Sequence, residues 1–258
     1  MGAPLMSPTC DAAARPRLWL GRGYAGYLGP ALSIDPHSTA VACLAVGIDD
    51  RFTFRAEGVG DVAARSAYSP ARYKHQLIPG HGRMLFVFVE PTALATPDYA
   101  AHMHRAIGPF GFDHHAEHQL VVLCQQPDVE IASIMRRLRL SVPRVMDPRI
   151  RAAIATIRAD PAGDTSATKM ALELGLSTSY FLRLFSNQTA TSYRRYKLWA
   201  RMIHAADGLT AGHDLTRCAV DAGFDSLSHF SRTFHSMFGL SPSALLGAGV
   251  RLAIEPST

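Results

Sequence analysis

Residues 169–185, KMALELGLSTSYFLRLF, and residues 218–234, CAVDAGFDSLSHFSRTF, share one pattern that decides the fold of the C-terminal half. In each stretch a small alanine is followed four residues later by a glycine: Ala171 and Gly175, then Ala219 and Gly223. Alanine lets two helices cross closely, and glycine adopts the left-handed conformation of a tight turn at little cost. Each stretch therefore predicts a helix-turn-helix.

The two stretches are copies of one motif. The capping serine, the core phenylalanines and the arginine recur 49 residues apart: Ser177, Phe181, Arg183 and Phe185 correspond to Ser226, Phe230, Arg232 and Phe234. The alanine and the glycine recur 48 residues apart, so the second turn is one residue longer, and Asp225 is the candidate for the extra position. A whole motif repeated with its caps is much stronger support than one match.

One long helix is predicted between the copies. Residues 191–207, TSYRRYKLWARMIHAAD, carry apolar side chains along one face and span ~25 Å as a helix. Such a helix can hold two recognition helices near the ~34 Å spacing of successive major-groove openings. Upstream, Asp147 followed by Pro148 predicts the cap and first position of another helix, with Ile150, Ile154 and Ile157 on its buried face.

Residues 147–246 as a whole resemble the DNA-binding domain of the AraC/XylS family of transcription regulators. The stretch 222–242, AGFDSLSHFSRTFHSMFGLSP, is the part closest to that family's signature. Two positions depart from the family pattern. Ala190 stands where the family usually has glycine, which predicts a less tightly turned exit from the first recognition helix, and Leu182 is apolar at a position that is often polar.

The resemblance implies which side chains read bases. These candidates are Ser179, Leu182 and Arg183 in the first unit, and Leu227, Ser228, His229, Ser231 and Arg232 in the second. Arginine pairs bidentately with guanine and leucine can contact a thymine methyl, so we expect the two arginines to dominate direct readout. The candidates for phosphate contacts are Thr178, Arg194, Arg195, Lys197 and Arg201.

The N-terminal half has a different periodicity. Short apolar runs broken by Gly and Pro predict strands at 17–29, 39–48, 51–56 and 84–91, and they resemble a cupin-like β-barrel, with SPARYKHQL (69–77) leading into a further strand. Helical spacing predicts helices over 98–107 and 128–138. We expect an α+β protein with a sensor and dimerisation domain at 1–145, whose helical part is 98–140, a linker at 140–148, and an all-α DNA-binding domain at 146–258.

A metal site is not predicted. A metal-binding cupin offers an HxH motif and a later histidine, but His37 stands alone and His75 is the only match for the later ligand. His114 and His118 would share a face if that segment were helical. The chain also lacks a G-x-S-x-G motif and a P-loop. We therefore expect no cofactor and no enzymatic activity.

Composition restricts the class of protein without identifying it. The net charge of +5 is modest, and the longest apolar run, 40–48, is far shorter than the roughly 18 residues of a membrane span. The first fifteen residues do not have the pattern of a secretory signal. We expect a cytoplasmic protein with Cys10, Cys43, Cys124 and Cys218 as reduced thiols.

Three functions remain open from the sequence. The first is a sequence-specific regulator that binds double-stranded DNA, acts as a homodimer, responds to a small-molecule effector in its barrel and contacts RNA polymerase. The second is a cupin-type metal-dependent enzyme with an appended DNA-binding domain. The third is a protein-interaction adaptor that has lost DNA binding. Strong salt dependence together with preference for one duplex would favour the first.

Overall fold

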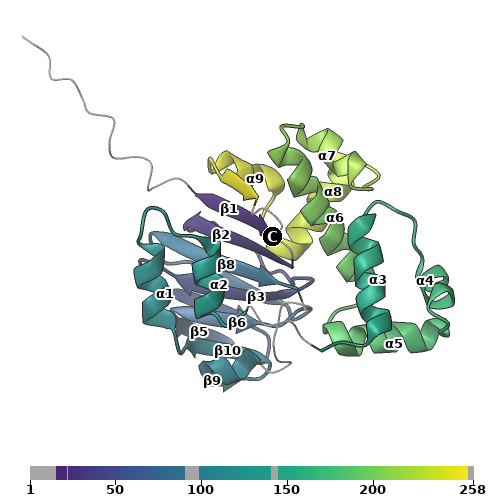
Figure 1. Cartoon of the computed structure of the whole chain (residues 1–258). Coiled ribbons are helices and arrows are strands. Elements are labelled where there is room, and N and C mark those ends of the chain that lie inside the picture. Colours follow the sequence, from purple (N-terminus) through teal and green to yellow (C-terminus); the bar gives the residue numbers. More distant parts are fainter. Residues whose placement is uncertain (1–15, 22, 91–98, 141–144, 255–258) are drawn as a thin grey trace, which may run out of the picture.

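The computed structural model describes residues 16–21, 23–90, 99–140 and 145–254. Residues 16–140 form a β region and residues 145–250 form a helical region that packs against one side of it (Figure 1). The chain then returns to the β region as a last short strand. Within the described residues, no helix is both long enough and apolar enough to cross a membrane.

The β region is built from two separate sheets. The large sheet has the strand order β11 (Arg251–Ile254), β1 (Arg17–Gly21), β2 (Tyr24–Pro30), β8 (Arg83–Val89), β3 (Ala42–Gly47), β6 (Ser66–Ser69), β10 (Phe110–His114), β9 (Met103–Ile107). The small sheet has the order β5 (Gly60–Ala64), β4 (Phe52–Ala56), β7 (His75–Ile78). No ladder joins the described strands of the two sheets, so the predicted closed barrel is wrong, while the α+β class is confirmed.

Alternation along β3 explains how the large sheet divides two cores. Leu44 and Val46 face α1 (Glu117–Cys124) and α2 (Ile131–Arg137), which cover one side of the sheet (Figure 1). Cys43 and Ala45 point the other way and pack against the small sheet. This period of two is what a strand buried on both faces requires. The β region is therefore layered as helices, large sheet and small sheet.

The segment before α1 differs from its predicted helix. Residues 99–102 form a short 3₁₀ helix, and residues 103–107 form edge strand β9, which pairs with β10 across a turn at Gly108 with φ of 57°. The pairing partner, with Phe110 and Phe112 both buried, outweighs the local helical spacing. The helix predicted over 128–138 is confirmed as α2, whereas Asp98 and residues 141–144 of the predicted linker lie outside the described residues.

The helical region contains seven described helices. They are α3 (Pro148–Ala159), α4 (Ala167–Glu173), α5 (Thr178–Thr189), α6 (Tyr193–Thr210), α7 (Leu215–Asp221), α8 (Leu227–Phe238) and α9 (Pro242–Gly247). The predicted start of α3 is confirmed, because the Asp147 side chain accepts a hydrogen bond from the Arg149 amide and Pro148 occupies the first turn. The predicted connecting helix is confirmed as the 18 residues of α6.

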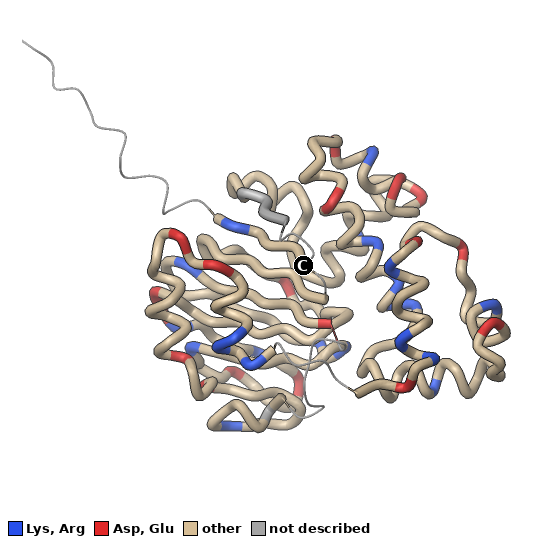
Figure 2. Tube along the Cα trace, viewed as in Figure 1, with Lys and Arg blue, Asp and Glu red and all other residues tan. Residues whose placement is uncertain are grey.

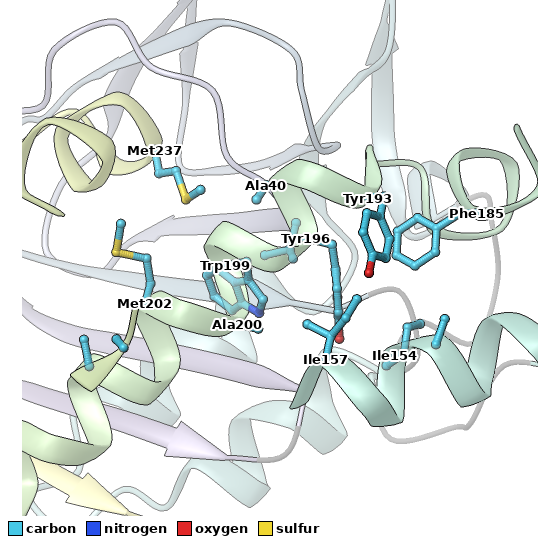
Figure 3. Packing of buried hydrophobic residues seen from close by; sticks show 14 of the residues in the cluster. Ala40, Ile154, Ile157, Phe185, Tyr193, Tyr196, Trp199, Ala200, Met202 and Met237 are labelled. Atoms are coloured by element: carbon cyan, nitrogen blue, oxygen red, sulfur yellow. The ribbon is translucent and has the colours of Figure 1, made fainter. Parts of the chain in front are cut away.

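The core of the helical region continues into the β region. Tyr196 and Trp199 of α6 are almost fully buried and pack with Ile154 and Ile157 of α3 (Figure 3). Ala40 joins the same cluster from the β region (Figure 3). The two regions therefore share apolar packing, which fixes their relative position more firmly than polar contacts alone.

Candidate nucleic-acid interface and the cavity behind it

The two helix-turn-helix units are built alike. In α5 and α8 the side chains of Ser177 and Ser226 accept hydrogen bonds from the amides three residues on, as the sequence predicts. Gly175 and Gly223 have φ of 67° and 80°, which is the left-handed conformation expected of the turns. Helices α4 and α7 begin 48 residues apart and α5 and α8 begin 49 apart, so the longer second turn is confirmed.

The side chains predicted to read bases are mostly accessible. Both arginines, Arg183 and Arg232, are exposed, and neither is in an ion pair with a described residue. The Arg183 guanidinium lies 5.5 Å from the Tyr180 ring centroid, which is a cation–π contact. Ser179, Leu182 and Ser228 are also exposed, whereas Leu227, His229 and Ser231 are half-buried.

The predicted phosphate-contact residues divide into two kinds. Arg194 is exposed, and Thr178 is half-buried at the first turn of α5. The other three donate to backbone carbonyls: Lys197 to Gly163 and Thr165, Arg195 to Ser38 and Thr39, and Arg201 to Pro161 and Gly223. Their role in phosphate binding stays a prediction, and in this structure their hydrogen bonds hold segments of the protein together.

Arg201 joins the turn of the second unit to the segment that precedes the first unit. Its Nη1 donates to the Gly223 carbonyl in the second turn at 2.7 Å, and its Nε donates to the Pro161 carbonyl ahead of the first unit at 3.1 Å. A Cβ at Gly223 would lie only 2.9 Å from the Cα of Ala162, so the two segments approach as closely as glycine allows. The spacing of the recognition helices thus depends on this junction as well as on α6.

The β region contacts the last turns of both recognition helices. Arg72 Nη1 donates to the hydroxyl of Ser186 on α5 at 3.4 Å. His235 Nε2 on α8 lies 3.0 Å from the Asp35 carboxylate, and the Asp35 amide donates to the carbonyl of Gly239 at 2.8 Å. Ser186 and His235 occupy equivalent positions, 49 residues apart. A shift of the β region would therefore act on equivalent positions of α5 and α8.

A buried carboxylate anchors this junction. Glu90, which follows β8 and is 5% exposed, accepts hydrogen bonds from Tyr196 at 2.5 Å and from the Trp199 indole at 2.9 Å, and it forms an ion pair with Arg158 of α3. Burial raises the pKa of the Tyr196 phenol, which therefore remains a donor. In the sequence, Glu90 is an acidic residue at the end of the apolar run MLFVFVE. That position alone did not predict its role.

A cavity lies behind the second unit, between the large sheet and α6, α8 and α9. Its volume is about 770 Å³, part of it open to solvent. The lining side chains are nearly all apolar and come from both regions: Leu20, Phe86 and Phe88 from strands, and Trp199, Phe234 and Phe238 from helices. Apolar cavities at an interface between parts of a fold are typical small-molecule sites.

The histidines considered for metal binding are only partly brought together. His37 and His75 are buried neighbours with ring centroids 4.6 Å apart, and the Ser69 hydroxyl lies 3.0 Å from Nδ1 of His75. His114 ends β10 and His118 lies on α1, so the expected shared helical face does not exist. Among the described residues, no three His, Cys, Asp or Glu side chains form a group that could hold a metal ion.

Cysteines and charge add two further observations. Cys43, Cys124 and Cys218 are buried free thiols, while Cys10 lies outside the described residues. Figure 2 shows acidic and basic positions interspersed over the β region, with basic positions gathered in the helical region around α3. This placement puts positive charge on the part of the molecule that carries the first unit.

The comparisons with known proteins agree with this geometry. A helix-turn-helix domain family matches residues 170–248. A crystal structure of apo ToxT from Vibrio cholerae shares the fold over 88% of this chain and 97% of its own, with 9% identity and a TM-score of 0.59. Unsaturated fatty acid-bound ToxT matches with a TM-score of 0.56 and 9% identity over 87% and 95% of the two chains.

A transcriptional regulator of Chromobacterium violaceum described as AraC-type matches 43% of this chain and 96% of its own, with 23% identity and a TM-score of 0.37. No curated protein matches the chain by sequence.

Two capped helix-turn-helix units on one connecting helix define a DNA-binding protein. The family match assigns residues 170–248 to a helix-turn-helix domain, and the chain as a whole shares the fold of ToxT.

Proposed function

We propose that α5 and α8 enter two successive major-groove segments of one duplex and that Arg183 and Arg232 make the dominant base contacts. The observation that carries this proposal is the duplicated exposure of the two arginines on equivalent positions of two capped recognition helices. Ser179, Leu182, Leu227, Ser228, His229 and Ser231 would supply the remaining groove contacts. Arg194 and Thr178 are the best-placed candidates for phosphates.

Arg232→Ala tests this reading on a duplex selected from a random pool by the full-length protein. We expect a loss of roughly 1 to 3 kcal/mol in binding, with relaxed preference at one base pair, because bidentate pairing with guanine is lost. Arg183→Ala should act alike at a base pair about one helical turn away. The matched control is Arg217→Ala on α7, an exposed arginine paired with Asp221 outside the recognition helices. Unchanged sequence preference in both test variants would contradict the proposal.

We also propose that the β region is a sensor and dimerisation domain, at 1–145, and that 146–258 is the DNA-binding domain. The cavity supports an effector site, since it is lined by both regions and a structure of the same fold is described as bound to an unsaturated fatty acid. An effector would act by binding one arrangement of the two regions better than another. The protein would work in the cytoplasm as a homodimer, with RNA polymerase as a further partner.

No observation favours the alternative of a cupin-type enzyme. His37 and His75 lie together, but the described residues around them add no third ligand of the usual kind. The pair belongs to the packed interior between the sheets, where His75 stacks on Phe54. A regulator without enzymatic activity is therefore the proposal that the structure supports best.

A further inference from the structure

We infer that the cavity behind the second unit takes an uncharged apolar molecule carrying one hydroxyl group, and not a fatty-acid anion. This inference rests on the proposed effector role of the cavity and specifies the chemistry of its ligand. It concerns the residues lining the space between β1, β2 and β8 on one side and α6, α8 and α9 on the other.

The lining has no counter-charge for a carboxylate. Among the described residues that border the cavity there is no lysine, arginine, aspartate or glutamate. A carboxylate that leaves water for such a site costs several kcal/mol unless it is paired with a cation. The nearby cation Arg158 is already committed to Glu90, which in turn holds the indole of Trp199. An anionic ligand would therefore meet apolar walls and a negative charge beyond them.

Among the described residues of the lining, two polar groups are without a hydrogen-bond partner: the Cys43 thiol, which is only a weak donor, and one nitrogen of His37. Tyr27 donates its hydroxyl hydrogen to the Pro30 carbonyl at 2.9 Å, and Trp199 donates to Glu90. His37 is 5% exposed and its Nδ1 lies 3.0 Å from the Asp35 carbonyl. Because a carbonyl can only accept, Nδ1 carries the hydrogen and Nε2 has a free lone pair. No described residue donates to Nε2.

His37 remains neutral under ordinary conditions. Burial lowers the pKa of the imidazole; the hydrogen bond with the Asp35 carbonyl opposes this in part, and the nearby His235 has a still smaller lowering effect. A neutral imidazole with Nδ1 protonated is a hydrogen-bond acceptor at Nε2. The matching ligand group is a donor without charge, which a hydroxyl provides and a carboxylate does not.

The walls set the rest of the ligand. Phenylalanine and leucine side chains on both sides favour a ligand with a hydrocarbon body, because its binding buries apolar area. Such a ligand would contact Phe234 and Phe238 of α8. Its binding would therefore act directly on the second recognition helix and only indirectly on the first.

A matched series of ligands with ten-carbon chains, one of them capped by an additional methyl group, tests the inference on the full-length protein at pH 8. Decan-1-ol, decanoate, decylammonium and decyl methyl ether compete with the uncharged dye Nile red, and displacement gives their relative affinities. We expect decan-1-ol to bind at least tenfold more tightly than decanoate and decylammonium. We expect it to bind severalfold more tightly than the ether, which has the same chain but no hydroxyl hydrogen.

Three variants separate the contributions. In His37→Phe the preference for the alcohol over the ether should vanish, and in His37→Lys the preference should move at least tenfold toward decanoate. Ala206→Phe, which fills the cavity from α6, should weaken all four ligands while leaving His37 in place. Thermal melting followed by circular dichroism identifies any variant that does not fold. The comparison of the four ligands on the wild-type protein tests the inference even if a variant fails to fold.

Decanoate binding as tightly as decan-1-ol to the wild-type protein would overturn the inference, as would failure of all four ligands to displace the dye. Neither result affects the DNA-reading proposal, which is measured on the protein without ligand through Arg183 and Arg232.

Discussion

The two helix-turn-helix units share one design but have different neighbours. The last turn of α8 carries Phe238, which contacts Phe88 of the β region with ring centroids 5.2 Å apart and lines the cavity. The equivalent residue of α5 is Thr189, whose hydroxyl donates toward the carbonyls of Phe185 and Thr191 and accepts from the Thr191 amide, all local to the end of α5. The first unit is therefore held mainly by its own core, and the second is built into the junction with the β region.

This difference teaches where a signal can enter. At the last turn of α5 the β region contributes the 3.4 Å hydrogen bond from Arg72, whereas α8 has a side-chain contact with Asp35, backbone hydrogen bonds and aromatic packing at the corresponding end. A change in the cavity reaches the second recognition helix by direct contact. The first recognition helix does not line the cavity, so a change reaches it through intervening contacts such as α6 and the Arg201 junction.

Phe238→Ala should produce the largest effect, because it removes an aromatic side chain from the junction. We expect a loss of about 3 kcal/mol in the free energy of unfolding, the low end for phenylalanine because the side chain is partly exposed. Denaturant unfolding measures it. The control is Tyr180→Ala on α5, a 38% exposed ring, which should cost less than about 1 kcal/mol. Equal losses would contradict the difference between the units.

Glu90→Gln should come next. The amide can still accept hydrogen bonds from Tyr196 and Trp199, but the negative charge that faces Arg158 is removed. We expect a loss of about 2 kcal/mol in the free energy of unfolding. Asp61→Asn is the matched control, since the pair of Arg55 and Asp61 is exposed to solvent and should contribute little to the free energy of unfolding. If both variants unfold at the same denaturant concentration, the buried carboxylate does not anchor the junction.

Acid should weaken the β region and with it the support of α8. Burial lowers the pKa of His75 and of His114 to about 4 in the folded state, with nearby His37 and His102 adding to the effect. The unfolded chain protonates these groups near pH 6.5. Their contribution to stability is therefore complete above that pH and is lost as the pH falls toward 4.

Between pH 6.5 and pH 4 the free energy of unfolding should fall by about 1.4 kcal/mol per pH unit for each of these histidines. Denaturant unfolding between pH 8 and pH 4 measures it, and His75→Gln should remove one histidine's share of the slope. His81→Gln is the control, because His81 is an exposed residue of a loop. A slope that is unchanged in His75→Gln would contradict the assignment.

Ala190→Gly should give the smallest effect, with the opposite sign. Ala190 ends α5 with φ of 55°, and its equivalent Gly239 ends α8 with φ of 73°, so the first exit turns as tightly as the second and the expectation of a looser turn is wrong. Glycine adopts the left-handed conformation without strain, so we expect the free energy of unfolding to rise by about 0.5 to 1 kcal/mol. Thermal unfolding checks this. A lower melting temperature would show that Ala190 is not strained.

The sequence predicted the helical region better than the β region for a physical reason. Caps, turn glycines and the alanine at the helix crossing are local signals, so the units, α3 and α6 could be read directly. Strand pairing depends on distant partners. For that reason β9 was taken for a helix, β5 and β6 were not anticipated, and the two sheets were taken for one barrel.

The candidate site shows the same limit. The exposure of Arg183 and Arg232 followed from the motif, but Arg195, Lys197 and Arg201 could not be separated from Arg194 by sequence. Their carbonyl partners lie in other segments, and backbone carbonyls leave no trace in residue types. The cavity was invisible for a similar reason, since its walls come from both halves of the chain.

Strand β11 pairs in parallel with β1, from Arg17 with Arg251 to Leu20 with Ile254, after the last helix has ended. The helical region is consequently attached to the sheet at its C-terminal end, where the described chain runs from α9 into β11. Backbone pairing at this point restricts how far the end of the helical region can move from the sheet without breaking hydrogen bonds.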